Sequence, residues 1–319
     1  MKQLHTSTQG LLSMVGTPIG NLGDVSERVR KTLAAADLIL CEDTRVTAKL
    51  LSCLDIHVPL KRCDENVIAE RIDESLDLLS AGVHIAFVSD AGMPGVSDPG
   101  QRLVDAALDE HIKVEVIPGP SAVICALVAS GLGMDHFFFE GFLPRKAGER
   151  TRRLQELIRI PGALVFYESP HRILDTLTSI AECMPQRRVA LVRELTKIHE
   201  QCVRGYASEL IDALQGKELR GECVIVVEGP SQDEIKAAAR EAMLHDLMTT
   251  AQESAGADTA GEGAQPSDET LSLDSAIRAA LTSHESKTKI AKRLSRAFDC
   301  SRQEIYLRIV EISEEESSS

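Results

Sequence analysis

The sequence predicts an α/β protein of two lobes with mainly parallel sheets, followed by a small C-terminal helical module. Short β-rich runs alternate with helical patterns between residues 11 and 229, and this alternation is typical of βαβ units and parallel sheets. The runs amount to about ten strands, too many for one compact twisted sheet, so two lobes are expected. Helical spacing returns only after a polar stretch over 250–270, which predicts the separate helical module.

The first lobe is predicted to span residues 1–133. Its β-rich runs predict strands and its amphipathic runs predict helices, in a sheet that is covered on both faces. The expected strands lie over 11–18, 38–43, 83–90 and 113–119, and the expected helices over 26–37, 44–54, 101–111 and 121–132. The boundary between the lobes is expected near Gly133 to Pro144.

The second lobe is predicted to span residues 134–230 with the same alternation. Its expected strands lie over 136–142, 163–169, 187–195 and 222–229, and its expected helices over 150–160, 171–182 and 208–216. Because parallel strands need helical crossovers, this order again favours a sheet with helices packed on it.

The region after the second lobe is predicted to be an acidic helix and flexible linker over 231–272. Residues 250–270 lack apolar periodicity and are rich in Ala, Gly, Ser and Glu, as linkers are. Residues 273–319 have the rhythm of a helix-turn-helix. A small helical pair that only packs or dimerises explains this pattern equally well.

The composition is that of a soluble globular protein, because 43% of the 319 residues are hydrophobic and 26% are charged. The N-terminus lacks the apolar segment of a secretory signal, and no apolar run is long enough to cross a bilayer. A cytoplasmic protein without membrane contact is therefore expected. Eight cysteines occur without a C-x-x-C pair, which indicates reduced, buried thiols and no metal site.

The net charge of -14 argues against a nucleic-acid partner until the distribution of charge is considered. Residues 231–274 hold ten acidic and two basic residues, whereas 145–153 hold five basic residues and one glutamate. Residues 276–310 hold eight basic and three acidic residues. The two basic segments offer places for an anion, and a solvated surface is the ordinary alternative for such segments.

Three loops rich in glycine and proline follow expected strands. They are VGTPIGN (15–21), VSDAGMPGVSDPG (88–100) and IPGPSAV (117–123). The 88–100 loop taken alone fits either a connector or a ligand loop. Because neighbouring parallel strands end at the same edge of a sheet, the three loops together predict one cofactor crevice. No G-x-G-x-x-G or Walker lysine motif is present, which disfavours a dehydrogenase and a P-loop nucleotidase.

Eight motifs in order resemble the tetrapyrrole methylase superfamily, and within it the branch that methylates ribosomal RNA. They are GTPIGN (16–21), EDTR (42–45), SDAGMPGVSDPG (89–100), PGPSAV (118–123), FEGFLPR (139–145), FYESPHR (166–172), RELTKIHE (193–200) and GECVIVVEG (221–229). The resemblance covers roughly residues 11–230. It implies S-adenosyl-L-methionine as cofactor, two α/β lobes with the cofactor between them, and a homodimer. The long acidic insert before the helical module departs from the family pattern.

The resemblance also implies which residues contact the cofactor. These are Pro18, Ile19 and Gly20 in the first loop, Asp90, Ala91, Gly92 and Met93 in the second, Ser121 and Ala122 in the third, and Phe166, Tyr167, Glu222 and Cys223 in the second lobe. The carboxylate of Asp90 suits ribose hydroxyls or a cationic ligand, since it accepts hydrogen bonds and carries negative charge.

The implied acceptor is the ribose 2'-hydroxyl of a cytidine in the decoding centre of 16S rRNA, within the small ribosomal subunit. Such a hydroxyl is a poor nucleophile, so it must be aligned with the methyl group and lose its proton as it attacks. The candidate catalytic residues are Glu194, Lys197 and Glu168, and the other possible proton acceptors are Glu42, Asp43 and Glu200. The candidate RNA contacts are Arg45, Arg145, Lys146, Arg152, Arg153 and Arg172. For each of these residues a structural ion pair is the alternative, and no metal is required.

Three functions remain open at this point. The first is ribose methylation of rRNA. The second is methylation of a small tetrapyrrole-like molecule or of a protein by the same fold, against which EDTR and the basic 145–153 segment argue. The third is RNA binding without catalysis through the C-terminal helices, against which the three intact loops argue.

Overall fold

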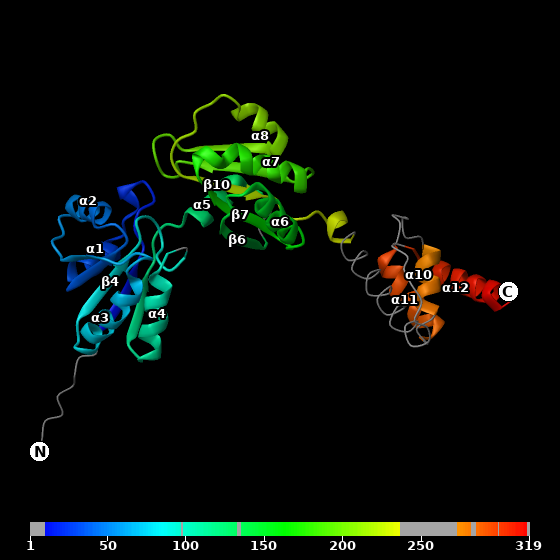
Figure 1. Ribbon diagram of the computed structural model, residues 1–319, viewed down its shortest axis with the longest axis horizontal. Helices are drawn as coiled ribbons and strands as arrows, with labels where there is room; N and C mark the ends of the chain where they lie inside the picture. The colour runs from blue at the N-terminus through cyan, green and yellow to red at the C-terminus, as the bar shows by residue number, and fades with distance from the viewer. Residues whose placement is uncertain are drawn as a thin grey trace, which may run out of the picture. The chain divides into compact units, whose positions relative to one another are not determined.

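The protein is described by a computed structural model that covers residues 10–96, 98–132, 135–236, 273–281, 285–298 and 300–317 (Figure 1). The chain forms two compact units, Met1–Gly229 and Pro230–Ser319. The first unit contains two five-stranded sheets, and the second contains helices. The predicted α/β class with C-terminal helices is thereby confirmed. Most of the predicted linker, residues 237–272, lies outside the described residues.

The first sheet is entirely parallel and has the strand order β3-β2-β4-β1-β5. Its strands are β1 (Leu11–Val15), β2 (Leu38–Cys41), β3 (Leu60–Arg62), β4 (His84–Val88) and β5 (Lys113–Ile117). The strand β1 pairs with β4 on one side and with the edge strand β5 on the other, so three strand ends lie next to one another. These are the strands that the three glycine-rich loops follow.

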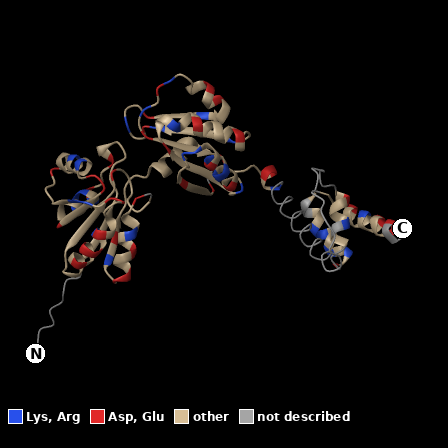
Figure 2. Ribbon diagram, viewed as in Figure 1, with Lys and Arg blue, Asp and Glu red and all other residues tan. Residues whose placement is uncertain are grey.

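Helices cover both faces of this sheet (Figure 1). They are α1 (Glu27–Ala35), α2 (Thr44–Leu54), α3 (Ile68–Ser80) and α4 (Gly100–Asp109), with the short η1 (Leu22–Asp24) before α1. Alternate residues of β1 point to opposite faces: Val15 packs with α1 and α2, whereas Leu12 and Met14 pack with α3 and α4. Polar α3 and α4 surfaces face away from the sheet and carry mostly acidic side chains (Figure 2).

Two elements of this lobe were not among the predicted ones. The strand β3 has only three residues and lies at the sheet edge, so no alternation marks it in the sequence. The helix α3 begins after Val67, which supplies no side-chain cap, whereas α1 begins at Ser26, whose hydroxyl accepts a hydrogen bond from the Val29 N–H. A helix without a capping residue lacks the usual signal of its start.

The second sheet is mixed and has the order β6-β7-β10-β8-β9. Its strands are β6 (Phe137–Phe142), β7 (Ala163–Glu168), β8 (Arg188–Arg193), β9 (Gln201–Tyr206) and β10 (Cys223–Val227). Only β6 and β7 pair in parallel; the other three ladders are antiparallel. The reason is that β7 and β8 run in the same direction but leave a gap, into which the last strand β10 fits antiparallel to both.

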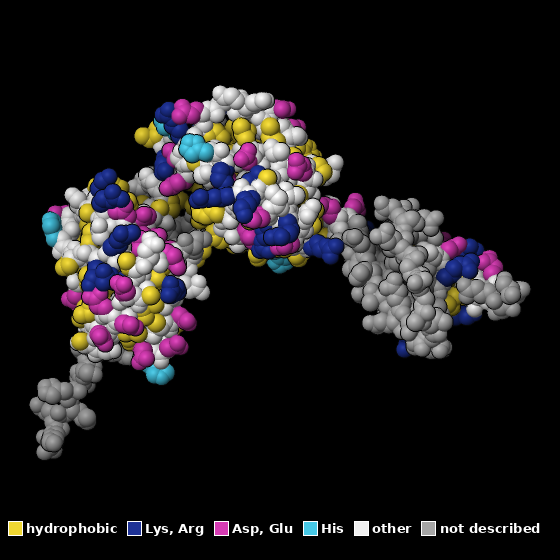
Figure 3. All heavy atoms as spheres, viewed as in Figure 1, with side chains coloured by type: hydrophobic (Ala, Val, Ile, Leu, Met, Phe, Trp, Pro, Cys, Tyr) yellow, Lys and Arg dark blue, Asp and Glu magenta, His cyan; other side chains and the backbone are white. Residues whose placement is uncertain are grey.

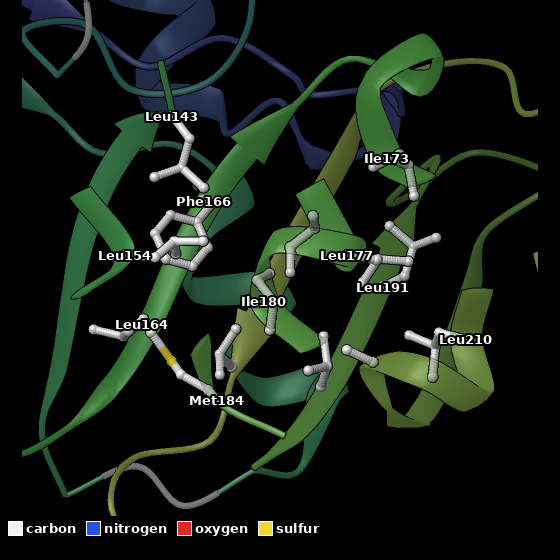
Figure 4. Packing of buried hydrophobic residues seen from close by; sticks show 14 of the residues in the cluster. Leu143, Leu154, Leu164, Phe166, Ile173, Leu177, Ile180, Met184, Leu191 and Leu210 are labelled. Atoms are coloured by element: carbon white, nitrogen blue, oxygen red, sulfur yellow. The ribbon is translucent and has the colours of Figure 1, made fainter. Parts of the chain in front are cut away.

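One face of the second sheet packs against α6 (Ala147–Leu157), α7 (Ile173–Cys183) and α8 (Ala207–Leu214). The short η2 (Pro170–Arg172) precedes α7. Figure 4 shows this core, in which Phe166 lies among Leu143 from the connection after β6, Leu154 of α6 and Leu164 of β7. The other face packs against α5 (Ala122–Ser130) through Val123, Ala126 and Leu127. The helix α5 is apolar on nearly every side, and it connects the two sheets of the first unit.

The second unit consists, in its described part, of α10 (Leu273–Leu281), α11 (Lys287–Ala297) and α12 (Arg302–Ser317). Buried isoleucines, leucines and alanines of the three helices form a core of their own, with Ile277, Ile290 and Ile309 fully buried. The short connection between α11 and α12 agrees with the helix-turn-helix rhythm of the sequence. Every helix that the structure describes is too short or too polar to span a membrane.

Candidate functional site

The three glycine-rich loops meet at the carboxyl ends of β1, β4 and β5. Thr17 and Gly92 exchange two backbone hydrogen bonds, with N···O distances of 2.9 and 3.1 Å, which join the first loop to the second. The Gly119 N–H donates to the Met93 sulfur at 3.1 Å, which joins the third loop to the second. A Cβ on Gly16 would lie 2.6 Å from the Gly119 nitrogen, so the first and third loops touch through glycine backbones.

Gly92 has a backbone conformation that other residues rarely adopt, with φ at +84°. A Cβ at this position would also lie 3.2 Å from the Ile19 side chain. The loop therefore needs glycine here both for its backbone turn and for the room beside Ile19.

A cleft of about 400 Å³ opens beside these loops, and below we call it the cofactor cleft. Its walls come from the first unit alone: Ile19, Glu42, Ser89, Asp90, Ala91, Gly92, Met93, Val96, Asp98, Ser121, Ala122, Val123, Ile124, Phe137, Phe139, Phe142 and Tyr167. One wall is aromatic, because the Phe139 and Tyr167 rings lie edge to face at 4.8 Å and the Phe142 ring lies 5.7 Å from Tyr167. The cleft thus offers small residues, an aromatic wall and carboxylates to a ligand.

The carboxylates of the cleft have different surroundings. Asp98 organises its own loop, since it accepts hydrogen bonds from the N–H groups of Gly95 and Gly100. Asp90 accepts a hydrogen bond from the Asp43 N–H at 3.0 Å, and its own N–H donates to Glu42 at 3.3 Å. Burial, reinforced by the negative charges of Asp98, Asp90 and Asp64, raises the pKa of Glu42. This concentration of negative charge favours a cationic ligand.

A second cavity of about 470 Å³ adjoins the cofactor cleft, and below we call it the polar cavity. It is lined by Glu42, Asp43, Thr44, Arg45, Arg62, Asp64 and Asp90. Two ion pairs lie along it, one between Arg45 and Asp43 and the other between Arg62 and Asp64. The bound arginines lower the pKa of Asp43 to about 2 and also lower that of Asp64.

Eight of the cofactor residues predicted from the sequence line the cofactor cleft. They are Ile19, Asp90, Ala91, Gly92, Met93, Ser121, Ala122 and Tyr167. The other five, Pro18, Gly20, Phe166, Glu222 and Cys223, are absent from its walls. Phe166 and Cys223 belong to the core on the opposite face of the second sheet, as Figure 4 shows for Phe166, so their side chains point away.

The residues predicted to be catalytic lie outside the walls of both cavities. The Lys197 ammonium donates to Glu194 at 2.9 Å and lies 3.4 Å from a carboxylate oxygen of Glu222. The same side chain packs on the first loop, because a Cβ on Gly20 would lie 2.5 Å from its Cγ. Glu168 is buried; it accepts a hydrogen bond from the Thr176 hydroxyl at 2.7 Å and lies 3.4 Å from Arg172.

The predicted RNA contacts differ in exposure. Arg45, Arg145, Lys146 and Arg152 are exposed, and Figure 3 shows basic side chains gathered over α6. Two of these exposed residues form ion pairs, Arg45 with Asp43 and Lys146 with Glu149. Arg153 instead donates to both oxygens of Glu140 and to Glu156. Arg172 donates to the carbonyl oxygens of Leu143 and Pro144.

Sequence reasoning missed part of the cleft. The sequence places the phenylalanines of β6 on a strand and in the motif FEGFLPR but does not identify them as cofactor contacts, although the run FFFEGF stands out in a chain with 3% aromatic residues. The sequence identifies Glu42 only as one of several possible proton acceptors. The thiols were expected to be buried, but Cys53 and Cys202 are exposed; all eight cysteines are free. The described residues include no group of histidine, cysteine or acidic side chains that could hold a metal ion.

Comparison with known proteins identifies the family. Residues 11–211 match the family described as tetrapyrrole (corrin/porphyrin) methylases. The chain belongs to the tetrapyrrole methylase family. Curated methylase relatives named ribosomal RNA small subunit methyltransferase I include one from Streptococcus pyogenes, 47% identical over 71% of this chain and 79% of that protein. Another, from Thermotoga maritima, is 46% identical over 69% of this chain and 99% of that protein. The predicted resemblance is thus confirmed.

Solved methylase structures share the fold. A cobalt precorrin-4 methyltransferase superposes with a TM-score of 0.53 over 70% of this chain and 95% of the other, at 18% identity. A diphthine synthase superposes with a TM-score of 0.54 over 69% of this chain and 90% of the other, at 14% identity.

This methylase uses S-adenosylmethionine as methyl donor. The cofactor cleft fits that molecule on three counts. Its carboxylates, including Asp90, complement a sulfonium cation, the ring of Tyr167 suits an adenine, and Gly92 leaves room beside the loops. When bound, the donor supplies a methyl group that its positive charge has already activated.

Proposed function

We propose that this methylase transfers the methyl group to the ribose 2'-hydroxyl of a cytidine in the 16S rRNA decoding centre. The observation that carries this proposal is the identity to relatives named ribosomal RNA small subunit methyltransferase I. The identity is 47% over 71% of this chain for one such relative and 41% over 72% of this chain for another. The motifs EDTR, FYESPHR and RELTKIHE, which resemble this branch of the family, support the ribose and cytidine specificity.

The turn between β8 and β9 supports a role for Lys197 beside the acceptor. Two residues of this turn, Glu194 and Thr196, have positive φ values of 52° and 64°, which non-glycine residues rarely adopt. A strained turn held against the first loop is typical of a functional segment. We propose that Lys197 orients the ribose or its phosphate.

The carboxylates predicted as proton acceptors are already engaged. The hydrogen bond and positive charge of Lys197 lower the pKa of Glu194, which makes Glu194 a weaker base. A backbone N–H, a hydroxyl and a guanidinium surround Glu168. In our proposal Glu194 therefore positions Lys197, and Glu168 positions the η2 turn through Arg172.

We further propose a cytoplasmic homodimer. The exposed side of α5 supports self-association, because Ile124 is 48% and Val128 is 67% exposed on an otherwise apolar helix. Ile124 also lines the cofactor cleft, as does Phe137, which is 46% exposed, so the proposed interface borders the cleft. Contiguous exposed apolar side chains of this kind commonly mark an interface.

The decisive experiment offers labelled S-adenosylmethionine together with small ribosomal subunits from cells that lack this gene. Expected is incorporation of about one methyl group per subunit, mapped to a cytidine by 2'-O-methylation-sensitive primer extension. Naked 16S rRNA, a tetrapyrrole and a protein extract serve as alternative acceptors. Incorporation into one of the latter two, with none into RNA, would refute the proposed substrate.

A further inference from the structure

We propose that Glu42 accepts the proton of the acceptor hydroxyl, and that the polar cavity receives the ribose and flanking phosphates of the target nucleotide. The inference rests on the proposed methylation of RNA and deepens it, because it names the acceptor subsite and the base. The sequence-based expectation preferred Glu194 and Glu168 and named Glu42 only as one of the other possible proton acceptors.

Glu42 lies where the two cavities adjoin. Glu42 and Asp90 are the two residues that line both the cofactor cleft and the polar cavity. The reacting hydroxyl must contact the methyl donor in the cofactor cleft, while the rest of its nucleotide needs a second space, for which the polar cavity is available. A base for that hydroxyl therefore has to lie where the two cavities adjoin.

Glu42 differs from the neighbouring carboxylates in its hydrogen bonds and ion pairs. Asp98 is bound to its loop N–H groups, and Asp43 and Asp64 are paired with arginines. Asp90 accepts a hydrogen bond from a backbone N–H at 3.0 Å. Among the residues that the structure describes, the one hydrogen bond that Glu42 accepts is a long one, 3.3 Å, from the Asp90 N–H. A carboxylate has capacity for about four hydrogen bonds, so Glu42 retains room for a substrate hydroxyl.

Electrostatics supports the same residue. Burial is the main cause of the raised pKa of Glu42, and Asp98, Asp90 and Asp64 add repulsion. A carboxylate with a raised pKa is a stronger base than an ordinary glutamate. The opposite holds for Asp43, whose pKa is lowered to about 2.

The proposed step transfers the methyl group to the acceptor oxygen and the hydroxyl proton to Glu42. The acceptor oxygen forms a bond to the methyl carbon while the carbon–sulfur bond of the donor breaks, and the sulfur keeps the electron pair. The hydroxyl proton passes to the Glu42 carboxylate, which later releases it to water. No oxidant, metal or further reactant is needed.

The arginines of the polar cavity suit the phosphates. The Arg45 and Arg62 side chains are 86% and 59% exposed, and ion pairs at such exposure contribute little to stability. Either guanidinium can therefore exchange its aspartate for a phosphate oxygen, to which arginine binds with two parallel hydrogen bonds. This assigns Arg62, which the sequence did not single out, to RNA binding.

The first test is Glu42→Gln in single-turnover methylation of small ribosomal subunits, with the donor bound beforehand. We expect a rate loss of about 100-fold at pH 7, the usual contribution of a general base. The donor is used at saturating concentration for each variant, so that any change in donor affinity, measured separately by titration calorimetry, does not enter the rate. The control Glu110→Gln removes a carboxylate from the exposed end of α4 in the same lobe. A Glu42→Gln rate equal to that of the control overturns the assignment.

The second test needs no activity. Because the folded pKa of Glu42 is raised, its ionisation opposes folding at pH values above its unfolded pKa. Glu42→Gln should therefore raise the melting temperature by about 1–3 °C at pH 7.5, and the gain should vanish near pH 4. A structural carboxylate predicts a lower melting temperature instead, and that result would contradict the role of Glu42.

The third test concerns the polar cavity alone. Arg62→Gln should weaken binding of a decoding-centre RNA fragment, measured by anisotropy without the donor, and should lower the slope of log K against log salt by about 0.9. The control is Arg28→Gln on the exposed surface of α1. Unchanged affinity and slope would exclude the cavity as the acceptor subsite. If the wild-type protein methylates no RNA in any assay, the proposed function itself fails, which is a distinct outcome.

Discussion

At the residue scale, the three loops depend on a few positions that only small or acidic side chains can fill. Gly92 turns with a positive φ and is held to Thr17 by two backbone hydrogen bonds. Gly16 and Gly119 are in backbone contact. Asp90 lies at the junction of both cavities and links to the EDTR motif through the Asp43 N–H. Changes at these positions should affect ligand binding before they affect folding.

We predict that Gly92→Val and Asp90→Ala each lower S-adenosylmethionine affinity by about 100-fold or more. Valine at a positive φ is strained by about 1–3 kcal/mol, and its side chain would fill space beside Ile19. Alanine at position 90 removes a carboxylate from the cleft and the partner of the Asp43 N–H. Titration calorimetry measures both affinities.

The matched control is Asp105→Ala on the exposed side of α4, which removes the same charge away from the cleft. Its donor affinity should equal that of the wild type. Circular dichroism establishes that each variant is folded at the temperature of the titration. Full affinity in a folded Gly92→Val or Asp90→Ala variant would show that the 88–100 loop does not hold the donor.

At the element scale, the predictable features were those with a local chemical signal. The loops after β1, β4 and β5 could be predicted, because glycine and proline mark them and parallel strands end at one edge. The alternation of strands and helices predicts parallel pairing in general but does not tell where a late strand inserts, so the position of β10 between β7 and β8 needed the structure. The aromatic wall of the cleft also needed it, since β6 and β7 meet the loops only in three dimensions.

The same limit applies to single charged residues. RELTKIHE indicated a cluster of charges, but the spacing could not reveal that Glu194 is bound by Lys197 while Glu42 retains free capacity. Hydrogen-bond partners are set by tertiary contacts, and one sequence carries no record of them.

The basic segment 145–153, which runs from the β6–α6 connection into α6, contains two kinds of arginine. Arg145 and Arg152 are exposed, whereas Arg153 is held by Glu140 and Glu156. We predict that replacing Arg145 and Arg152 together by glutamine weakens binding to small ribosomal subunits. The slope of log K against log salt should fall by about 0.9 for each phosphate contact that is lost. Filter binding at several salt concentrations measures the slope.

Arg153→Gln is the comparison for this segment. It should destabilise the protein, because it leaves the partly buried Glu140 without its two hydrogen bonds, by about 1–3 kcal/mol. Its salt slope should stay at the wild-type value. If the Arg145 and Arg152 double variant also keeps the wild-type slope, the exposed basic residues of the 145–153 segment are a solvated surface only.

At the scale of the whole molecule, the residues of the candidate site and the C-terminal helices belong to different units. Every residue of the cofactor cleft and of the polar cavity lies in Met1–Gly229, and the core of α10–α12 uses residues of the second unit alone. The Thermotoga maritima relative is covered to 99% by an alignment of 220 residues, which is 69% of this chain. About a third of this chain therefore has no counterpart in that relative.

We predict that a chain ending at Gly229 keeps its S-adenosylmethionine affinity within about twofold, because no cleft residue is removed. It should bind small ribosomal subunits more weakly, with a smaller salt slope. The reason is that α11 carries the exposed Lys289 and Lys292, and such lysines bind phosphate by charge. Titration calorimetry and filter binding measure the two effects.

The full-length variant with Lys289 and Lys292 replaced by glutamine distinguishes charge from folding. If the helices bind RNA through these lysines, it should reproduce most of the affinity loss of the shortened chain while its melting curve stays unchanged. If the helices only pack or dimerise, this variant should bind subunits like the wild type, and the shortened chain should differ in oligomeric state instead. A loss of donor affinity in the shortened chain would contradict the separation itself, since it would require the second unit to support the cleft.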